Sequence, residues 1–463
     1  MKLREQARTI GVGAALLALA ATACSPSPSP RLLLLLTVDT LRADRIGAYG
    51  SPLGLTPNLD ALLAESQLFT SAWAPCAYTL PSVSALLTGR YPEELGMQTN
   101  SSLLDSGFQT LASVLRLYGW RTGAVVSNYV LRRESGVDNG FELFDDSFPQ
   151  REENRLQPER VAPDTTSAAL ALLDRLREGP GADAPLFLWV HYQDPHGPYQ
   201  PPRGFRERFL EAERAAPLGD RTLPPGQDSL GLGQIPDYQY VHGQHESAFY
   251  RAGYDGEIAY LDGEVGRLLE GLAARGLRQD ALVAFTADHG EGLGERDYWF
   301  AHGEYLTDPL VRVPLAIRIP GEPGRRRDEL ASLIDLFPTL LGVAGVATPS
   351  GYPGRDLLAP EQGDASRAVY LATLRGSTVP RYGLVADGWK YVVEDGAEAP
   401  VEELFRLEDG ERDRAAEAPE VVSALRERLA ALREGLHRPP RERRQSLTPE
   451  QREHLRALGY VED

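Results

Sequence analysis

Cysteine and lysine are both scarce in this chain, and each scarcity excludes something. Only Cys24 and Cys76 occur among 463 residues, which excludes a fold held together by a disulfide framework. Lysine occurs only at Lys2 and Lys390, so arginine supplies nearly all of the positive charge. The formal net charge is −18, and because an acidic surface repels phosphate backbones, we do not expect a nucleic acid as a partner.

The N-terminus resembles an export signal rather than a membrane span. A basic start is followed by the apolar run 10–23, which is too short to cross a bilayer comfortably. The run ends at Cys24 and leads into alternating serine and proline, which resembles a bacterial lipoprotein signal with an acylated cysteine. We therefore expect a lipoprotein-type signal peptide over 1–24, a tether over 25–30, and export to a membrane-anchored position at the outer membrane or the periplasmic face. An ordinary secretory signal that contains a cysteine is the alternative.

Continuous apolar runs alternate with amphipathic segments along the chain. Four runs are typical of strands covered on both faces, namely 32–38, 122–127, 186–192 and 281–287. Spaced apolar residues between these runs indicate three helices, at 56–65, 110–118 and 254–276. The alternation predicts an α/β fold in which a mostly parallel central sheet is flanked by helices.

The pattern changes near residue 320. The later segments indicate a helix at 330–346, two strands within 382–393 and an amphipathic helix at 419–434. We therefore expect a smaller C-terminal α+β subdomain. The expected divisions are a catalytic domain over 31–320, the subdomain over 321–435 and a docking tail over 436–463.

Polar side chains follow directly after two of the apolar runs. Asp39 comes after the first run, and Asp288 and His289 come after the last. Sites in open α/β sheets form beyond the carboxyl ends of the strands, so these side chains should meet. Carboxylates with an imidazole suit zinc, manganese or a similar ion. Taken alone, Asp39 could equally cap the turn that follows it.

A third element places Thr79 at the entrance of a short helix that ends at Gly89. Free backbone N–H groups and the positive end of the helix dipole favour an oxyanion there, such as sulfate or phosphate. An isolated threonine at this position would be read as a helix cap. Its meaning therefore depends on the other motifs.

Together the motifs resemble the sulfatases of the alkaline phosphatase superfamily over about residues 31–410. The resemblance is found in Val38-Asp39-Thr40-Leu41-Arg42, Thr79-x-Pro81-Ser82, Leu87-Thr88-Gly89-Arg90, Asp194-Pro195-His196, Ala287-Asp288-His289-Gly290-Glu291 and His302-Gly303. It implies one divalent metal ion (calcium, zinc or manganese) on Asp39, Thr79, Asp288 and His289. It further implies that Thr79 holds the nucleophile position and that His196 and His302 reach the substrate or its leaving group.

The sequence departs from the family at the nucleophile and at the lysines. Sulfatases make a formylglycine from Cys or Ser in a Cys/Ser-x-Pro-x-Arg signal, but this chain has Thr79 and, at the arginine position, Val83. The family's pair of substrate-binding lysines is absent, and Arg42 and Asn128 are the candidate replacements. At the position of the family's second metal-binding aspartate, this chain has Thr40. Strand alternation suggests that His191 faces away from the site, into the core.

These features predict a metal-dependent hydrolase of sulfate or phosphate esters with Thr79 as nucleophile. A sulfated threonine lacks the second hydroxyl with which formylglycine expels sulfate, so a phosphoester hydrolase or a phospho-headgroup transferase is one alternative. A non-catalytic anion-binding protein on the same fold is another. A second ion on Asp194, His196 and His302 is conceivable, but we favour one ion, with His302 protonating the leaving oxygen. The expected substrate is an anionic ester of a small molecule, a glycan or a lipid.

Overall fold

The computed structural model of the chain describes residues 30–148, 160–359, 367–374, 378–396, 400–436 and 442–457. The expected signal peptide, Cys24 and all but the last residue of the expected tether lie outside these ranges. Within the described ranges, no helix combines the length and the apolar character that crossing a bilayer requires.

A large, mainly parallel sheet forms the centre of the molecule, and in the described chain it has eight strands in the order β4-β3-β5-β1-β6-β7-β2-β8. Their bounds are β1 (Leu32–Val38), β2 (Gln67–Trp73), β3 (Arg121–Val126), β4 (Leu143–Asp145), β5 (Leu186–Tyr192), β6 (Ala281–Ala287), β7 (Leu315–Arg318) and β8 (Arg325–Ser332). Strand β7 runs antiparallel to both of its neighbours, and the other pairings are parallel. The four strands expected from apolar runs are confirmed as β1, β3, β5 and β6.

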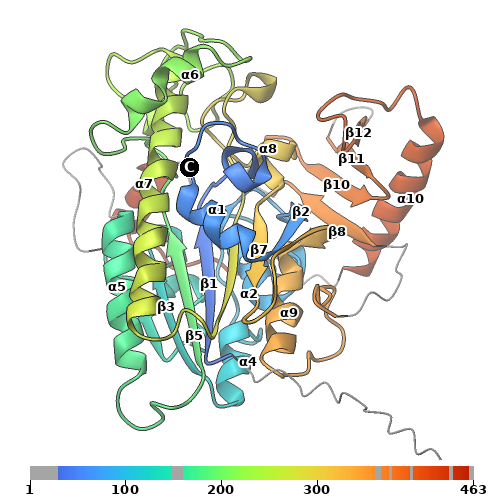
Figure 1. Cartoon of the computed structure of the whole chain (residues 1–463). Helices are drawn as coiled ribbons and strands as arrows, with labels where there is room; N and C mark the ends of the chain where they lie inside the picture. The colour runs from blue at the N-terminus through green and yellow to red at the C-terminus, as the bar shows by residue number, and fades with distance from the viewer. Residues whose placement is uncertain are drawn as a thin grey trace, which may run out of the picture.

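Helices cover both faces of this sheet. The long helices α5 (Ala162–Leu176) and α7 (Ser247–Ala274) pack against each other over one face, as Figure 1 shows. On the opposite face α9 (Leu336–Val343) packs against α2 (Thr79–Thr88) and α4 (Leu111–Leu117). The remaining helices of this part are α1 (Pro57–Ala64), α3 (Pro92–Leu95), α6 (Leu210–Arg214) and α8 (Asp308–Val311).

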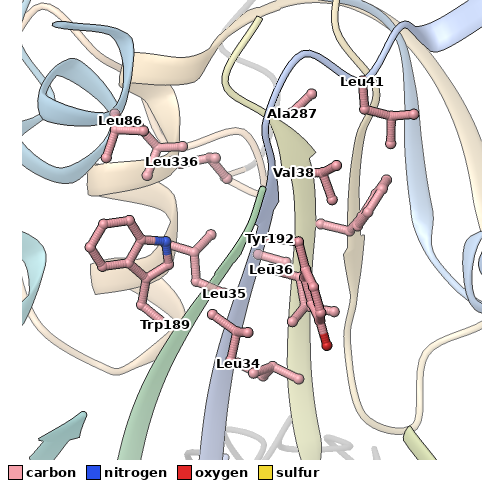
Figure 2. Close-up of a cluster of buried hydrophobic side chains, with 14 of the residues drawn as sticks. Leu34, Leu35, Leu36, Val38, Leu41, Leu86, Trp189, Tyr192, Ala287 and Leu336 are labelled. Atoms are coloured by element: carbon pink, nitrogen blue, oxygen red, sulfur yellow. The ribbon is translucent and has the colours of Figure 1, made fainter. Parts of the chain in front are cut away.

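Alternation along the strands divides the core between these two layers. In Figure 2 Trp189 lies on the side of β1 where Leu86 of α2 and Leu336 of α9 lie, whereas Val38 and Tyr192 point to the other side. Because parallel partners in register share a face, odd-numbered residues of β1 and β5 face α2. The site residues that extend these strands therefore face the helix that carries Thr79.

A small antiparallel sheet with the strand order β12-β11-β10-β9 forms the C-terminal subdomain. Its elements are β9 (Ala368–Ala372), β10 (Arg381–Ala386), β11 (Trp389–Glu394), β12 (Val401–Arg406) and α10 (Pro419–Gly435), which packs on β10 and β11. The mixed α/β architecture with a smaller α+β subdomain confirms the expected fold class.

The start of the subdomain differs from the expectation. Residues 325–332, which were expected in the second subdomain, form β8 at the edge of the large sheet. The α-helix expected over 330–346 is shorter, because α9 spans only Leu336–Val343. Strand β8 reads Arg-Arg-Arg-Asp-Glu-Leu-Ala-Ser and is largely solvent-facing, so it lacks the apolar run that revealed the central strands.

The described part of the tail lies against the large domain. The backbone N–H of Gln445 donates to Ser101 O (3.0 Å), and its side-chain amide donates to Ser102 O (3.0 Å) and accepts from Arg132 (3.0 Å). In α11 (Pro449–Ala457), Leu455 is fully buried in the main core.

Candidate active site

Asp39 and Asp288 emerge side by side because their strands are in register. Val38 pairs with Ala287 across β1 and β6, so the next residue of each strand leaves the sheet at the same level. The N–H of Asp288 donates to Val38 O (3.2 Å), and the N–H of Asp39 donates to Tyr192 O (3.0 Å). Both side chains are fully buried. The sequence therefore placed these two carboxylates correctly at the carboxyl ends of the strands.

Each carboxylate has one oxygen satisfied and one oxygen without a partner among the described residues. Oδ1 of Asp288 accepts from the N–H of Thr40 (3.1 Å) and of His289 (2.8 Å), and Oδ2 of Asp39 accepts from the Asn128 amide. Asp39 Oδ1 and Asp288 Oδ2 have no hydrogen-bond partner. Burial raises the pKa of Asp39, and burial together with Asp39 raises the pKa of Asp288 to about 6. Two buried carboxylate oxygens without hydrogen-bond partners are suited to binding a cation.

His289 and Thr79 complete this group. Nδ1–H of His289 donates to Gly290 O (2.9 Å), which orients Nε2 toward the carboxylates. That nitrogen lies 3.6 Å from Asp288 Oδ2, 3.9 Å from Asp39 Oδ1 and 3.3 Å from Thr79 Oγ1. Burial lowers the pKa of His289, but the two carboxylates raise it further, so the net effect is a rise. A proton held there occupies the place that a metal cation would take.

His191 stands beside the same carboxylates, which overturns the expectation that it faces away. Ligand atoms of Asp39, His191 and Asp288 all lie within 4.8 Å of one another and could hold a metal ion. His191 is the register partner of Thr37, and parallel partners share a face, so it faces the site. Alternation within β5 alone does not fix which face its residues take; the register with β1 does.

His191 is held by a hydrogen bond to Thr37, and its other ring nitrogen faces Asp39. Thr37 Oγ1 accepts from Trp189 Nε1 (2.9 Å), so the Thr37 hydroxyl hydrogen is available for His191 Nδ1 (2.8 Å). If it is donated there, Nε2 carries the ring hydrogen; this nitrogen lies 3.8 Å from Asp39 Oδ2 and has no hydrogen-bond partner among the described residues. Burial lowers the pKa of His191 to about 4, which keeps the ring neutral. The unpaired carboxylate oxygens are therefore bordered by two imidazoles, His191 and His289, of which His289 also contacts Thr79.

His196 and His302 lie close together next to this group. The His302 ring is 4.5 Å from the His289 ring and 5.4 Å from the His196 ring, centre to centre. His196 Nδ1 donates to Gly197 O (2.8 Å), and burial lowers its pKa to about 4. Burial and the neighbouring His289 lower the pKa of His302 well below its usual value. The structure therefore brings together all three histidines that the resemblance singled out.

Glu291 is a site residue to which the sequence gave no role. It is fully buried, and its Oε1 lies 3.2 Å from His302 Nδ1, while Oε2 accepts from the Tyr199 hydroxyl (2.8 Å). Burial raises the pKa of Glu291 to about 7. Its position after Asp288-His289-Gly290 was the available signal, but only the fold shows that it contacts His302.

Close backbone approaches hold these loops together. A Cβ on Gly290 would lie 1.9 Å from Pro309 O, and a Cβ on Gly303, whose φ is +104°, would lie 2.7 Å from the Tyr78 ring. Glycine is therefore needed at both positions. The contact at Gly303 keeps the loop of His302 next to the residue before Thr79.

Arg42 and Asn128, the expected anion contacts, both make polar contacts with other groups of the protein. The guanidinium of Arg42 donates to Asp44 (2.6 Å) and Glu291 O (3.2 Å) and pairs with Glu295 (2.8 Å), so two carboxylates already neutralise it. Asn128 donates to Asp39 and accepts from the N–H of Val130 (2.8 Å). Both side chains therefore support the loops and carboxylates of the site.

Lys390, the sole lysine of the described chain, lies outside the site. It is fully buried on β11, where it donates to Leu306 O (3.1 Å), Glu411 (2.6 Å) and Asp308. It thereby joins the small sheet to α8 of the large domain. This position agrees with the absence of substrate-binding lysines.

Comparison with known proteins places this arrangement in a family. A family model described as Sulfatase matches residues 31–346. The chain belongs to the sulfatase family. Human iduronate 2-sulfatase is 28% identical over 393 residues, covering 69% of this chain and 70% of that protein. Choline-sulfatase of Rhizobium meliloti (strain 1021) is 26% identical over 395 residues, covering 76% and 75%. Family membership identifies this sulfatase-family chain as a hydrolase of the sulfate-ester type.

Solved structures with the same fold include enzymes for two ester classes. One, in complex with its substrate D-glucosamine-2-N,6-O-disulfate, has a TM-score of 0.72 at 19% identity and covers 87% of this chain and 97% of its own. The phosphonate monoester hydrolase of Agrobacterium radiobacter has a TM-score of 0.68 at 22% identity, with 88% and 95% covered. At these identities the likeness establishes the fold of this sulfatase-family chain.

Proposed function

We propose that the protein is a metal-dependent hydrolase of anionic esters in which the Thr79 hydroxyl is the nucleophile. The observation that carries this proposal is the meeting of Thr79 Oγ1 and His289 Nε2 with the unpaired oxygens of two buried aspartates. Asp39, Thr79, Asp288 and His289 would hold one divalent ion, and their oxygen and imidazole donors fit calcium, zinc or manganese. When bound, such an ion lowers the cost of deprotonating a hydroxyl and neutralises charge on the ester.

The reaction has two steps at Thr79. The Thr79 hydroxyl loses its proton to solvent and its oxygen attacks the sulfur or phosphorus atom; the bond to the leaving oxygen breaks, and His302 supplies a proton to that oxygen. Water then attacks the same sulfur or phosphorus atom, the bond to Oγ1 breaks, one water proton passes to Oγ1, and the inorganic anion leaves. His196, beside His302, would contact the ester oxygens.

The identity of the nucleophile favours phosphate esters over sulfate esters. Formylglycine expels sulfate through its second hydroxyl, which threonine lacks, whereas a phosphothreonine can be opened by attack of water on phosphorus. We propose therefore that this sulfatase-family enzyme turns over phosphate esters faster than sulfate esters. The natural substrate would be a small-molecule, glycan or lipid ester, in keeping with the sugar disulfate in one structural neighbour.

The test compares three aryl esters with purified metal-loaded protein: 4-nitrophenyl sulfate, 4-nitrophenyl phosphate and bis(4-nitrophenyl) phosphate. Thr79→Val removes the hydroxyl at nearly constant volume and should reduce turnover by at least about 10³-fold. Thr88→Val is the matched control, because Thr88 is a buried threonine of the same helix whose hydroxyl donates to Ser84 O (2.7 Å). Unchanged turnover in Thr79→Val would overturn the proposal. Binding of inorganic phosphate without turnover of any ester would support a non-catalytic anion-binding protein instead.

We also propose that the protein is exported and anchored through lipid on Cys24, as its N-terminal sequence suggests. Metabolic labelling with a radioactive fatty acid should mark the wild-type chain. A Cys24→Ser chain should be unlabelled and should leave the membrane fraction. Equal labelling of both chains would contradict the anchor.

A further inference from the structure

The parallel strands of the large sheet start at one edge, and helix α4 ends at the same edge. Strands β3 and β5 start level with one another, because Arg121 pairs with Leu186. Leu186 also pairs with Leu32, and Leu32 pairs with Ala281, so β1 and β6 start at this edge too. Helix α4 ends at Leu117, just before β3 begins. In Figure 1 this edge is the lower end of the sheet, and α6 lies at the upper end.

An exposed apolar pair stands out from this edge. Leu117 and Tyr118 are the most exposed large hydrophobic side chains of the described chain, at 76% and 60%, and they are adjacent. The turn at Gly119 (φ +84°) ends the helix and returns Trp120 to the core. Arg116, beside the pair, is exposed as well. Arginine, leucine and tyrosine together suit a membrane interface, where leucine enters the apolar region while the tyrosine ring and the guanidinium stay at the headgroups.

The position of Cys24 in the sequence restricts which edge of the sheet can lie against an anchoring membrane. Only residues 25–30 lie between Cys24 and Arg31, and even a fully extended chain of that length spans at most about 25 Å. Arg31 directly precedes β1, so a lipid on Cys24 would hold the lower edge near the bilayer. Asp39 and Asp288 follow the opposite ends of strands that rise about 23 Å.

We propose that the edge carrying Leu117 and Tyr118 rests on the lipid bilayer in which Cys24 is anchored, so that the site faces the aqueous phase. This inference rests on the proposed anchor and narrows the proposed substrate, because esters then reach Thr79 from solution and not from lipids of the same bilayer. Two side chains bind a bilayer weakly by themselves. The anchor makes their binding intramolecular, which raises their effective concentration at the surface and lets them fix the orientation.

A fluorescent label on the lower edge tests this orientation. Ala182→Cys places a thiol in the exposed loop 178–182, which is tied to the start of β3 by the bond from Arg121 to Glu178 O (2.7 Å). Cys76 is fully buried and Cys24 carries the lipid, so the dye NBD attaches at the new thiol. The full lipid-anchored chain is reconstituted in vesicles of phosphatidylethanolamine and phosphatidylglycerol that carry nitroxide headgroups. Because nitroxides quench only at short range, the label should lose fluorescence.

Leu232→Cys gives the matched label position at the opposite edge. Leu232 is 41% exposed and pairs with Tyr298, in the loop that leads to His302. A label there should keep its fluorescence on the same vesicles.

Serine substitutions test the apolar pair itself. In the Ala182→Cys chain, the double change of Leu117→Ser and Tyr118→Ser should restore most of the lost fluorescence, because the edge is then no longer held on the bilayer. Leu218→Ser is the control, since Leu218 is an exposed leucine close to α6, and it should leave the quenching unchanged.

The outcomes separate this inference from the proposals on which it rests. Absence of fatty acid on Cys24 defeats the anchor and this orientation with it. With Cys24 acylated, a label at Ala182 that loses no more fluorescence than the label at Leu232 defeats the orientation alone. Quenching at Ala182 that survives the two serine substitutions overturns the role of Leu117 and Tyr118. All of these readouts are independent of turnover at Thr79.

Discussion

Removal of the metal ion should destabilise the protein more at about pH 7.5 than at about pH 5. Burial and the neighbouring Asp39 raise the pKa of Asp288 from 3.8 to about 6 in the ion-free protein. A carboxyl whose pKa is raised by folding takes up a proton, so its penalty is complete above the folded pKa and disappears as the pH falls toward 3.8. The difference between 3.8 and about 6 corresponds to about 3 kcal/mol for Asp288 alone.

The stability of the metal-loaded protein should instead rise with pH, because the ion needs ionised ligands and competes with their protons. The assay is urea unfolding of loaded and chelated protein at both pH values. Groups remote from the ion, such as Asp255 with its pKa of about 8, titrate in both forms and cancel in the difference. A loaded-minus-chelated difference in unfolding free energy that does not grow with pH would refute the reasoning.

Asp288→Asn provides the decisive variant. Its Oδ1 keeps the two N–H donors, and its new NH₂ group lies where Oδ2 faces His289 Nε2 at 3.6 Å. The unfolding free energy of chelated Asp288→Asn should therefore exceed that of chelated wild type by up to about 3 kcal/mol at pH 7.5. Adding the ion should not raise it further. Asp262→Asn is the control, since both Asp262 oxygens already accept from N–H donors and the change should destabilise. A chelated Asp288→Asn less stable than wild type would be contrary evidence.

Three further changes test the surroundings of the site. Lys390→Met removes the buried ammonium that pairs with the half-buried Asp308 and Glu411, which keep only their longer contacts to Arg312 and Arg296, and it should cost about 1.5–3 kcal/mol in urea unfolding; a loss below about 0.5 kcal/mol would argue against the pairing. Asn128→Ala frees the Asp39 carboxylate and should weaken metal binding by about 10–100-fold in a competition with a chromophoric chelator, without changing turnover at saturating metal. Thr40→Gly relieves a left-handed φ of +54° and should stabilise the chelated protein by about 1 kcal/mol, whereas a loss of stability would show that the Thr40 side chain matters more than its strain.

The sequence predicted the parts of the fold that are buried on both faces. The strands β1, β3, β5 and β6 are continuous apolar runs, and such runs leave few alternatives to a parallel sheet with helices on each side. Strand β8 escaped because it is an edge strand whose residues are mostly charged. Its place in the large sheet depends on pairing with β2, which lies more than 250 residues earlier.

The site was predictable where residues follow strands directly and unpredictable where contacts depend on register or loop packing. The rule that parallel strands end at the same edge of the sheet is enough to predict the positions of Asp39, Asp288 and His289. Placing His191 at the site requires the register that pairs it with Thr37. Placing Glu291 there requires the loop that brings His302 back over it. A motif with a single arginine also does not reveal that Arg42 pairs with two carboxylates, Asp44 and Glu295.

The charges of the site are of the kind that the proposed metal ion would balance. Asp39, Asp288 and Glu291 face the same region, whereas burial lowers the pKa of His196 and His302. With Arg42 neutralised and the described lysine in the subdomain contact, an ion-free site would repel an anionic ester. A bound cation would reverse that balance at the point where the Thr79 oxygen lies. Under the proposed function, substrate binding and activation of the nucleophile would both depend on binding of the ion.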